Sequence, residues 1–203
     1  LRKSFSKYFN YIILQLSYPN ITKKDNMDWM EHLQLLEKHH TSTNHKEVEY
    51  NVVFRLLNAA DYGVPQIRHR VIIVGFRKDF HADWAFPAPT HSREDLFYEK
   101  YITGSYWDSH KIPIQKRDSI SSFEKDKIKR YFDEHHHLQR WQTVRDAFIG
   151  LPDPLTKEAQ SFFNHDFRGG AKVYTGHSGS VMDEPSKTIK AGAHGVPGGE
   201  NMI

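Results

Sequence analysis

Gln66, Arg68 and Arg70 place one amide and two guanidinium groups at alternate positions of a short segment. Side chains alternate faces in an extended chain, so these three point one way while the intervening Ile67 points the other. At a rise of about 3.3 Å per residue the two arginines lie about 6.6 Å apart, close to the phosphate spacing of a nucleic-acid strand. Arginine suits phosphate oxygens and base-edge acceptors because its planar fork donates in fixed directions. On spacing alone, a charged edge strand that keeps the sheet soluble is the stronger interpretation.

A second candidate segment runs from Glu184 to Gly199, where a short β-prone run enters a loop with four glycines. Glycine allows positive φ and a close approach of the backbone to a partner. Thr188 supplies a hydroxyl suited to a phosphate, and Lys187 and Lys190 supply positive charge. In isolation an ordinary glycine-rich turn is the favoured interpretation. A nucleotide phosphate loop is disfavoured because no Gly-Lys-Ser/Thr ending follows the glycines.

The composition excludes several kinds of site. The chain has 203 residues, a net charge of +3 and no cysteine, so disulfides and thiolate metal sites are excluded. The mild positive charge permits a polyanionic partner without requiring one. His135–His137 makes a poor metal-binding set, because adjacent residues on a helix point in different directions, and no metal site is expected. No membrane span is expected either, since the apolar runs are far shorter than the roughly 18 residues required.

Periodicity and capping residues predict the main elements. The expected elements are a helix at Ser4–Leu16, a helix from Asp28 to about Lys38, a loop at His39–Lys46, a buried strand at Tyr50–Leu57, a strand at Arg70–Phe76, an exposed helix at Glu124–Glu134 and a helix capped by Thr143. The four tryptophans are expected in a core or at a domain interface: Trp29, Trp84, Trp107 and Trp141.

The thirteen residues Asn58–Arg70 resemble the Gln-x-Arg-x-Arg motif of the DNA cytosine-5 methyltransferases together with its Asn-Ala-x-Asp-Tyr-Gly-Val-Pro lead-in. By this resemblance, Arg70 holds O2 of a flipped-out cytosine and Arg68 holds the DNA backbone. Gln66 then orients the loop. His69 stands where the family more often has Glu, which leaves both arginines in place.

A Pro-marked segment, Phe86–Ser92, is similar to the one that leads from the catalytic domain of this family into its target-recognition domain. The resemblance assigns residues 1–84 to the C-terminal part of the catalytic domain. It assigns residues 85–203 to the target-recognition domain, incomplete at its C-terminus. The implied fold class is α/β, with the C-terminal edge of a Rossmann-like, S-adenosylmethionine-dependent methyltransferase sheet and a small mixed α+β recognition domain.

The Glu184–Gly199 segment resembles the Thr-Ile/Leu pair and glycine-rich recognition loop of the same family. By this match Thr188 contacts the DNA backbone, and the residues that follow approach base edges in the major groove. The implied DNA-binding residues are Lys187, Thr188, Lys190, Gly192, His194, Gly198 and Gly199.

The resemblance implies an enzyme that transfers a methyl group from S-adenosylmethionine to C5 of a cytosine flipped out of double-stranded DNA. The family attacks C6 with a cysteine thiolate, and its cofactor loop reads Phe-x-Gly-x-Gly. This chain has neither, so no cofactor-binding residue is assigned and the chain is expected to be inactive alone. The expected parent is a monomeric, cytoplasmic bacterial enzyme, paired in function with a restriction endonuclease.

Two alternatives remain open from the sequence. The chain is either part of one such enzyme or a non-catalytic DNA-recognition subunit of a methyltransferase split between two polypeptides. A relative of the RNA cytosine methyltransferases is disfavoured by the long insertion between the two motif segments.

Overall fold

The computed structural model describes residues 5–42, 48–135, 137–167, 169 and 179–188. The chain divides into two compact units. Unit 1 comprises Leu1–Leu56 and Val71–Pro87, and unit 2 comprises Leu57–Arg70 and Ala88–Ile203. The segment that carries Gln66, Arg68 and Arg70 therefore groups with the second unit, whereas the flanking strand residues group with the first.

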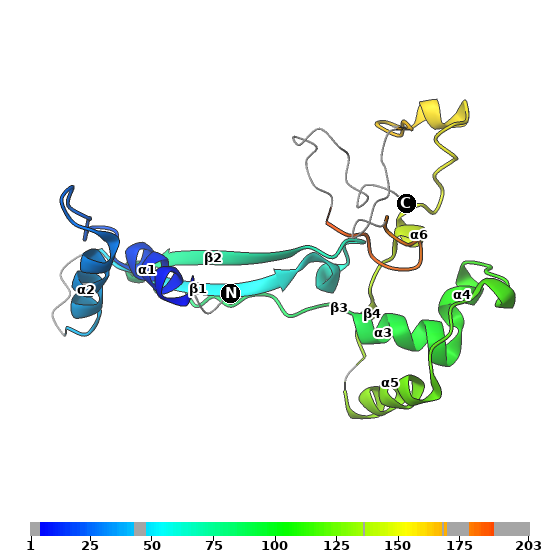
Figure 1. The fold of residues 1–203 in the computed structure, drawn as a ribbon, viewed down its shortest axis with the longest axis horizontal. Coiled ribbons are helices and arrows are strands. Elements are labelled where there is room, and N and C mark those ends of the chain that lie inside the picture. Colours follow the sequence, from blue (N-terminus) through cyan, green and yellow to red (C-terminus); the bar gives the residue numbers. More distant parts are fainter. Residues whose placement is uncertain (1–4, 43–47, 136, 168, 170–178, 189–203) are drawn as a thin grey trace. The chain divides into compact units, whose positions relative to one another are not determined.

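Unit 1 is built on two helices, α1 (Ser6–Ser17) and α2 (Trp29–His40), which pack against each other (Figure 1). Its buried residues are Tyr11, Leu14, Tyr18, Leu33 and Leu36, with Ile21 and Trp29 packed against them. Asp28 caps α2, because its carboxylate accepts hydrogen bonds from two backbone N–H groups of the first turn. Both predicted helices and the predicted Asp28 cap are confirmed.

Helix α2 extends two residues beyond its predicted end. His39 and His40 belong to its last turn, so the loop predicted from His39 begins too early. The Tyr18 hydroxyl lies 2.6 Å from His40 Nδ1, and the Tyr18 ring packs edge-on against His39 at 4.8 Å between centroids. These contacts with α1's C-cap stabilise the last turn. Residues 43–46 of the predicted loop lie outside the described residues.

Strands β1 (Tyr50–Asn58) and β2 (His69–Arg77) form a two-stranded sheet (Figure 1). Both strands were predicted, but the expectation that the first is buried is wrong. Val53, Phe54 and Leu56 are exposed, Leu56 to 60%. In the described part of the chain each strand has a single neighbour, which leaves most of their side chains uncovered.

Unit 2 contains a second small sheet and several short helices. Strand β3 (His91–Ser92) pairs in parallel with β4 (Gln139–Arg140). The helices are α3 (Arg93–Tyr98), the π-helical turn η4 (Glu99–Thr103), α4 (Ser105–Ser109), α5 (Ser122–Glu134) and α6 (Val144–Ala147). Short 3-10 turns complete the chain: η2 (Ala59–Tyr62), η3 (Lys78–Phe80) in unit 1, η5 (Ile114–Lys116) and η6 (Glu158–Ser161). Within the described ranges, no helix has both the length and the apolar character needed to cross a membrane.

The core of unit 2 draws on segments far apart in the sequence. Its buried members are Ala60, Leu96, Tyr106, Trp107 and Trp141, with Ile67 and Ile112 packed against them. Because Ala60 and Ile67 come from the segment between β1 and β2, that segment is part of the unit 2 core. The described chain as a whole is thus a mixed α/β structure with short sheets.

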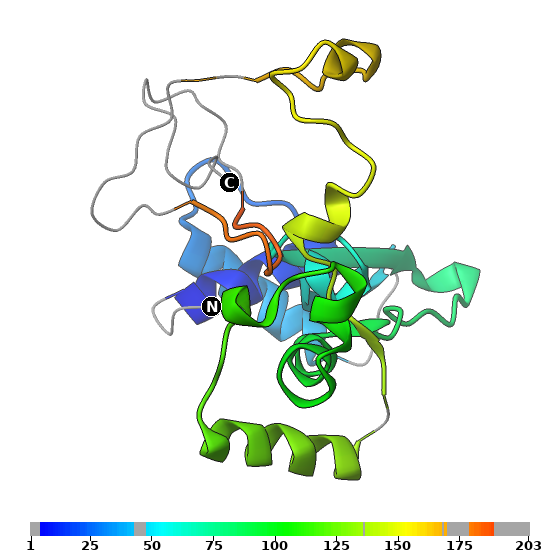
Figure 2. The same cartoon turned by 90° about the vertical axis from the view of Figure 1, so that its right-hand side faces the viewer.

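Two predicted helices of unit 2 are confirmed at their caps. Helix α5 lies beside α3 (Figure 2) and has no buried residue; it begins after Ser121, which forms a reciprocal capping box with Glu124. Thr143 caps α6, and Asp146 serves as its capping-box partner although Glu or Gln is more usual there. Stacking of Phe132 on Tyr98, at 3.8 Å between ring centroids, fixes α5 to α3.

The tryptophans divide into two groups. Trp107 and Trp141 are buried in unit 2, and Trp29 packs on the unit 1 core, as predicted. Trp84 is 36% exposed and contacts the rings of Phe76 and Phe86 instead, so a core position for Trp84 is wrong.

Candidate nucleic-acid interface

The segment Asn58–Arg70, called here the arginine loop, is closed by the side chain of its first residue. Asn58 Oδ1 accepts hydrogen bonds from the backbone N–H of Arg68 at 3.0 Å and of Ala60 at 3.5 Å. The Ala59 N–H donates to the Arg68 carbonyl at 3.1 Å. Asn58 is buried, so its amide holds both ends of the loop together and fixes the backbone at Arg68. This loop-closing role of Asn58 was not predicted from the sequence.

Gly63 sits where the loop turns against β3. Its φ of +84° is left-handed, and a Cβ at this position would lie 2.7 Å from His91 Cε1. Glycine alone has the backbone freedom and the missing side chain that this approach requires. The turn and its contact with His91 thus depend on the residue type at position 63.

A buried tryptophan connects the arginine loop to the rest of unit 2. Trp141 Nε1 donates to Asp61 Oδ1 at 2.9 Å, and the Asp61 carbonyl accepts from the Thr90 N–H at 3.0 Å. A buried indole N–H needs an acceptor, and Asp61 supplies it. Nothing in the sequence pairs two residues 80 positions apart, which is why this contact was missed.

The side chains of the arginine loop separate into an inward and an outward set. Ile67 packs against the core, Gln66 is half-buried, and Arg68 and Arg70 are exposed. Ile67 packs inward as predicted, but the predicted alternation does not continue beyond it, because Arg68, His69, Arg70 and Val71 are all exposed. Arg70 Nη1 donates to the His69 carbonyl at 2.7 Å, and the Arg68 guanidinium has no partner among the described residues.

The second motif segment lies directly against the first. Gln66 and Ser186 form a parallel β-bridge, in which the Ser186 N–H donates to the Pro65 carbonyl at 2.9 Å. The Ile67 N–H in turn donates to the Ser186 carbonyl at 2.8 Å, and Thr188 Oγ1 donates to the Ile67 carbonyl at 2.8 Å. Two segments about 120 residues apart are thus joined by an isolated β-bridge and its flanking hydrogen bonds, with Arg68 following immediately.

The predicted DNA-contact residues of the second segment are only partly described. Lys187 is exposed, and its backbone N–H donates to Ser180 Oγ at 3.0 Å. Thr188 is half-buried, and its hydroxyl proton is directed at Ile67, so a phosphate contact by Thr188 stays a prediction. The remaining five lie outside the described residues: Lys190, Gly192, His194, Gly198 and Gly199.

Unit 2 also contains a network of largely buried charged side chains centred on Asp146. Arg140 forms a two-pronged ion pair with Asp146 at 2.7 and 2.9 Å, and His110 Nε2 lies 2.9 Å from the same carboxylate. Burial alone raises the pKa of Asp146, but hydrogen bonds from Arg140 and Thr143 more than offset this and lower the pKa to about 2. Asp146 therefore stays charged at neutral pH and stabilises the start of α6.

The histidines and carboxylates of the described chain do not cluster in a way that suits a metal. Within residues 5–42, 48–135 and the later described ranges, no three of them lie close enough together to hold an ion. His135, from the predicted helix end, stacks on Tyr131 at 4.2 Å between ring centroids. What the site offers is exposed guanidinium groups on a tightly hydrogen-bonded backbone, an arrangement that suits phosphates and base edges.

Comparisons with known proteins also indicate a protein that contacts DNA. The family described as C-5 cytosine-specific DNA methylase matches residues 29–168, which include the arginine loop. Type II methyltransferase M.BsuRI of Bacillus subtilis is 40% identical over 94 residues, covering 32% of this chain and 22% of the relative. M.FnuDI of Fusobacterium nucleatum is 48% identical over 64 residues (31% and 17%), and M.BspRI of Lysinibacillus sphaericus is 59% identical over 54 residues (27% and 12%).

The matched part spans between 12% and 22% of the length of these three relatives. No solved structure matches the chain. The family match covers more than half of the chain and includes both the arginine loop and the core that supports it. The chain belongs to the C-5 cytosine-specific DNA methylase family.

Proposed function

We propose that this chain supplies the DNA-contacting part of a Type II DNA cytosine-5 methyltransferase, comprising the edge of the catalytic domain and most of the target-recognition domain. The observation that carries the proposal is the isolated β-bridge between Gln66 and Ser186. It joins the segment expected to hold the target cytosine to the segment expected to read the surrounding bases. Such an enzyme must both recognise its site and hold the extruded base, so adjacency of the two segments is what the function requires.

Within this surface, Arg68 contacts a DNA phosphate, Arg70 contacts the flipped cytosine and Gln66 keeps the loop in register. Support comes from a comparison with Arg77, the last residue of β2. Arg77 is engaged in a two-pronged ion pair with Asp79 at 2.6 and 2.7 Å. The guanidinium groups of Arg68 and Arg70 form no ion pair with any described residue and are exposed, so both are available to an anionic partner.

The segment that begins at Lys187, called here the recognition segment, recognises the DNA sequence. Lys187 and Lys190 contact phosphates, and Gly192, His194, Gly198 and Gly199 belong to the part that approaches base edges. Thr188 anchors the start of this segment by donating its hydroxyl proton to the Ile67 carbonyl, and it contacts a DNA phosphate by exchanging that hydrogen bond for one to the phosphate oxygen. A contribution of lysines to phosphate binding implies an affinity for duplex DNA that falls as salt rises.

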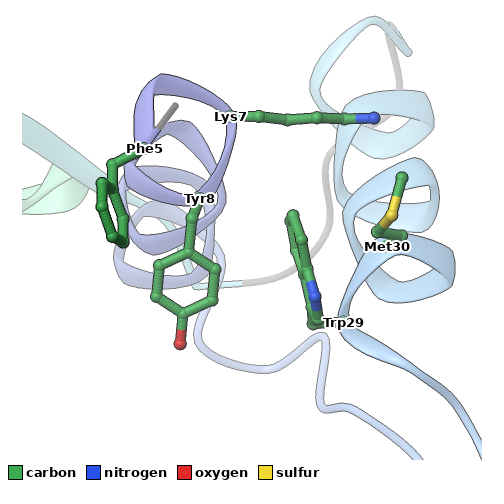
Figure 3. A pocket seen from close by; sticks show the side chains of 5 residues that line it. All are labelled: Phe5, Lys7, Tyr8, Trp29 and Met30. Carbon is green, nitrogen blue, oxygen red and sulfur yellow. The ribbon is translucent and has the colours of Figure 1, made fainter. Parts of the chain in front are cut away.

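The methyl donor of the family is S-adenosylmethionine, and a groove described in unit 1 does not fit it. This groove lies between α1 and α2 and is lined by Phe5, Lys7, Tyr8, Trp29 and Met30 (Figure 3). Lys7 is its one charged side chain, and none of the lining residues is a carboxylate that would accept from ribose hydroxyls. We infer that the cofactor and the nucleophilic cysteine are held by a part of the enzyme outside this chain. This chain joined to that part is called the complete enzyme below.

The biological setting follows from the relatives. They are Type II methyltransferases, the modifying members of restriction–modification systems. We propose that the complete enzyme is a cytoplasmic bacterial monomer, acting on double-stranded DNA, whose product protects a site from a cognate restriction endonuclease.

The test is Arg70→Ala in the complete enzyme, with Arg77→Ala as the matched control on the same strand. Arg70→Ala is expected to lower methyl transfer by about 100-fold, because a cytosine displaced from its reactive position reacts far more slowly. Duplex affinity should stay within about threefold, since the phosphate contacts remain. Arg77→Ala should leave both quantities near the wild type. Unchanged turnover in Arg70→Ala would remove Arg70 from the cytosine site.

A further inference from the structure

Asp183 and Glu184, just before the recognition segment, are held by side chains from three different elements. Arg145 of α6 forms a two-pronged ion pair with Asp183, at 2.7 Å from Nε and 3.0 Å from Nη2. The hydroxyl of Tyr106, from α4, donates to Asp183 Oδ1 at 2.9 Å. Burial alone raises the pKa of Asp183, but the hydrogen bonds from Arg145 and Tyr106 outweigh this and lower it. Asp183 is therefore ionised at neutral pH.

The third element supplies a lysine whose side chain is completely buried. Lys100 Nζ, from η4, donates to the Asp183 carbonyl at 3.1 Å and to Glu184 Oε1 at 3.1 Å. Its ammonium group also lies 5.2 Å from the centre of the Trp107 ring. Burial alone lowers the pKa of Lys100, but Glu184 and Tyr101 together more than compensate, by charge and by hydrogen bonding, and the pKa is raised. A buried ammonium is retained only where its partners are fixed, so these contacts hold Glu184 in one place.

Backbone hydrogen bonds reinforce the same position. The Arg145 N–H donates to the Met182 carbonyl at 2.8 Å, and the Val144 N–H donates to the Glu184 carbonyl at 3.0 Å. The start of α6 is thus bound to residues 182–184 through both main chain and side chain. Two residues further on, Ser186 bridges Gln66. The arrangement leaves residues 183–188 a single register relative to the arginine loop.

We propose that Asp183 and Glu184 are positioning residues for DNA recognition, clamped by Arg145, Tyr106 and Lys100 so that the recognition segment starts at a fixed place beside the arginine loop. This inference rests on the proposed function and deepens it. Neither carboxylate touches DNA in this account; each acts through the segment that follows. The clamp thereby sets how strongly the enzyme distinguishes its own site from other duplexes, because base readout depends on a fixed register whereas phosphate contacts do not.

The experiment uses the complete enzyme with Asp183→Asn and Glu184→Gln, and with Asp133→Asn on the exposed face of α5 as the matched control. The target site is first identified by mapping methylated cytosines in random-sequence DNA treated with the wild type. Affinities are then measured for a duplex carrying that site and for one of equal length without it. Asp183→Asn is expected to lower the ratio of the two affinities about tenfold, the size of one charge-assisted hydrogen bond. Glu184→Gln should lower it less, and Asp133→Asn should leave it unchanged.

A double-mutant cycle between Lys100→Met and Glu184→Gln tests the clamp directly. If the two groups act on recognition through each other, the double variant loses little more specificity than either single variant. The turnover number kcat on saturating target DNA should stay within about twofold of the wild type in each case, since the residues that touch the cytosine are intact.

Two outcomes would overturn the inference. An unchanged affinity ratio in Asp183→Asn and Glu184→Gln removes both residues from recognition. An equal loss of affinity for both duplexes, with a lowered melting temperature, shows a role in stability alone. If Asp183→Asn fails to fold, Glu184→Gln decides the matter. If the wild-type complete enzyme transfers no methyl group, the proposed function is refuted instead. That result is seen in the wild type itself, before any variant is compared with it.

Discussion

Replacing Gly63 by alanine imposes two separate penalties on the arginine loop. The first is conformational: at φ +84° an L-residue costs about 1–2 kcal/mol relative to glycine. The second is steric, because the new Cβ would lie 2.7 Å from His91 Cε1, and relief of such an overlap by moving a packed ring costs about 1–3 kcal/mol. Gly63→Ala is therefore expected to lower the free energy of unfolding by about 2–5 kcal/mol.

Gly150 provides the matched control. It has nearly the same backbone conformation, φ +82°, and no atom lies within 4 Å of a Cβ placed there. Gly150→Ala should therefore cost only the conformational penalty, about 1–2 kcal/mol. The difference between the two variants isolates the contact with His91. His91→Ala should remove that difference when it is combined with Gly63→Ala.

The assay is urea-induced unfolding of the complete enzyme, with each free energy compared with that of its parent. The reasoning predicts a larger loss for Gly63→Ala than for Gly150→Ala and a smaller loss in the His91→Ala background. Equal losses in Gly63→Ala and Gly150→Ala would refute the close approach of His91 to the turn.

Three further outcomes follow from the contacts of unit 2. Trp141→Phe should cost about 1 kcal/mol in thermal unfolding, since Asp61 loses its indole donor, whereas Trp84→Phe at an exposed site should cost less. The pKa of Asp146 is lowered from 3.8 to about 2 in the folded state, so its stabilisation is complete above about pH 4 and declines by about 2 kcal/mol as the pH falls through 2. Asp146→Asn should remove that decline from acid titrations followed by circular dichroism. Thr188→Val should weaken binding of the target duplex about fivefold, because it removes the hydrogen bond of the Thr188 hydroxyl. Thr188→Ser keeps the hydroxyl and should keep the wild-type affinity. Fluorescence anisotropy measures both affinities.

Local patterns predicted most of the secondary structure. The Asp28 and Thr143 caps, the amphipathic first helix and the exposed helix ending at Glu134 each depend on residues within a few positions of one another. Capping and periodicity are local effects, so a sequence contains what is needed to predict them.

Burial and long-range pairing could not be predicted by the same route. The apolar residues of β1 predicted a buried strand, yet Leu56 is exposed, because burial depends on which other strands and helices lie alongside. The contact of Trp141 with Asp61 and that of Lys100 with Glu184 join residues more than 75 positions apart. Their partners are set by the packing of unit 2, and no spacing rule identifies them.

The functional segments illustrate the same division. The arginine loop and the Glu184–Gly199 segment were identified by their resemblance to motifs of the cytosine-5 methyltransferases, since spacing alone favoured a charged edge strand and an ordinary glycine-rich turn. The bridge between Gln66 and Ser186, which makes them one surface, emerged only from the structure. So did Asn58, whose buried amide fixes the backbone at Arg68.

The most direct test of the account is to map the methyl groups that the complete enzyme places on random-sequence duplex DNA. The account predicts methylation at C5 of one cytosine within a defined site, formed about 100-fold more slowly by Arg70→Ala but at the wild-type rate by Arg77→Ala. Methylation of that site by Arg70→Ala at the wild-type rate, or the absence of any methylated cytosine with the wild type, would contradict it.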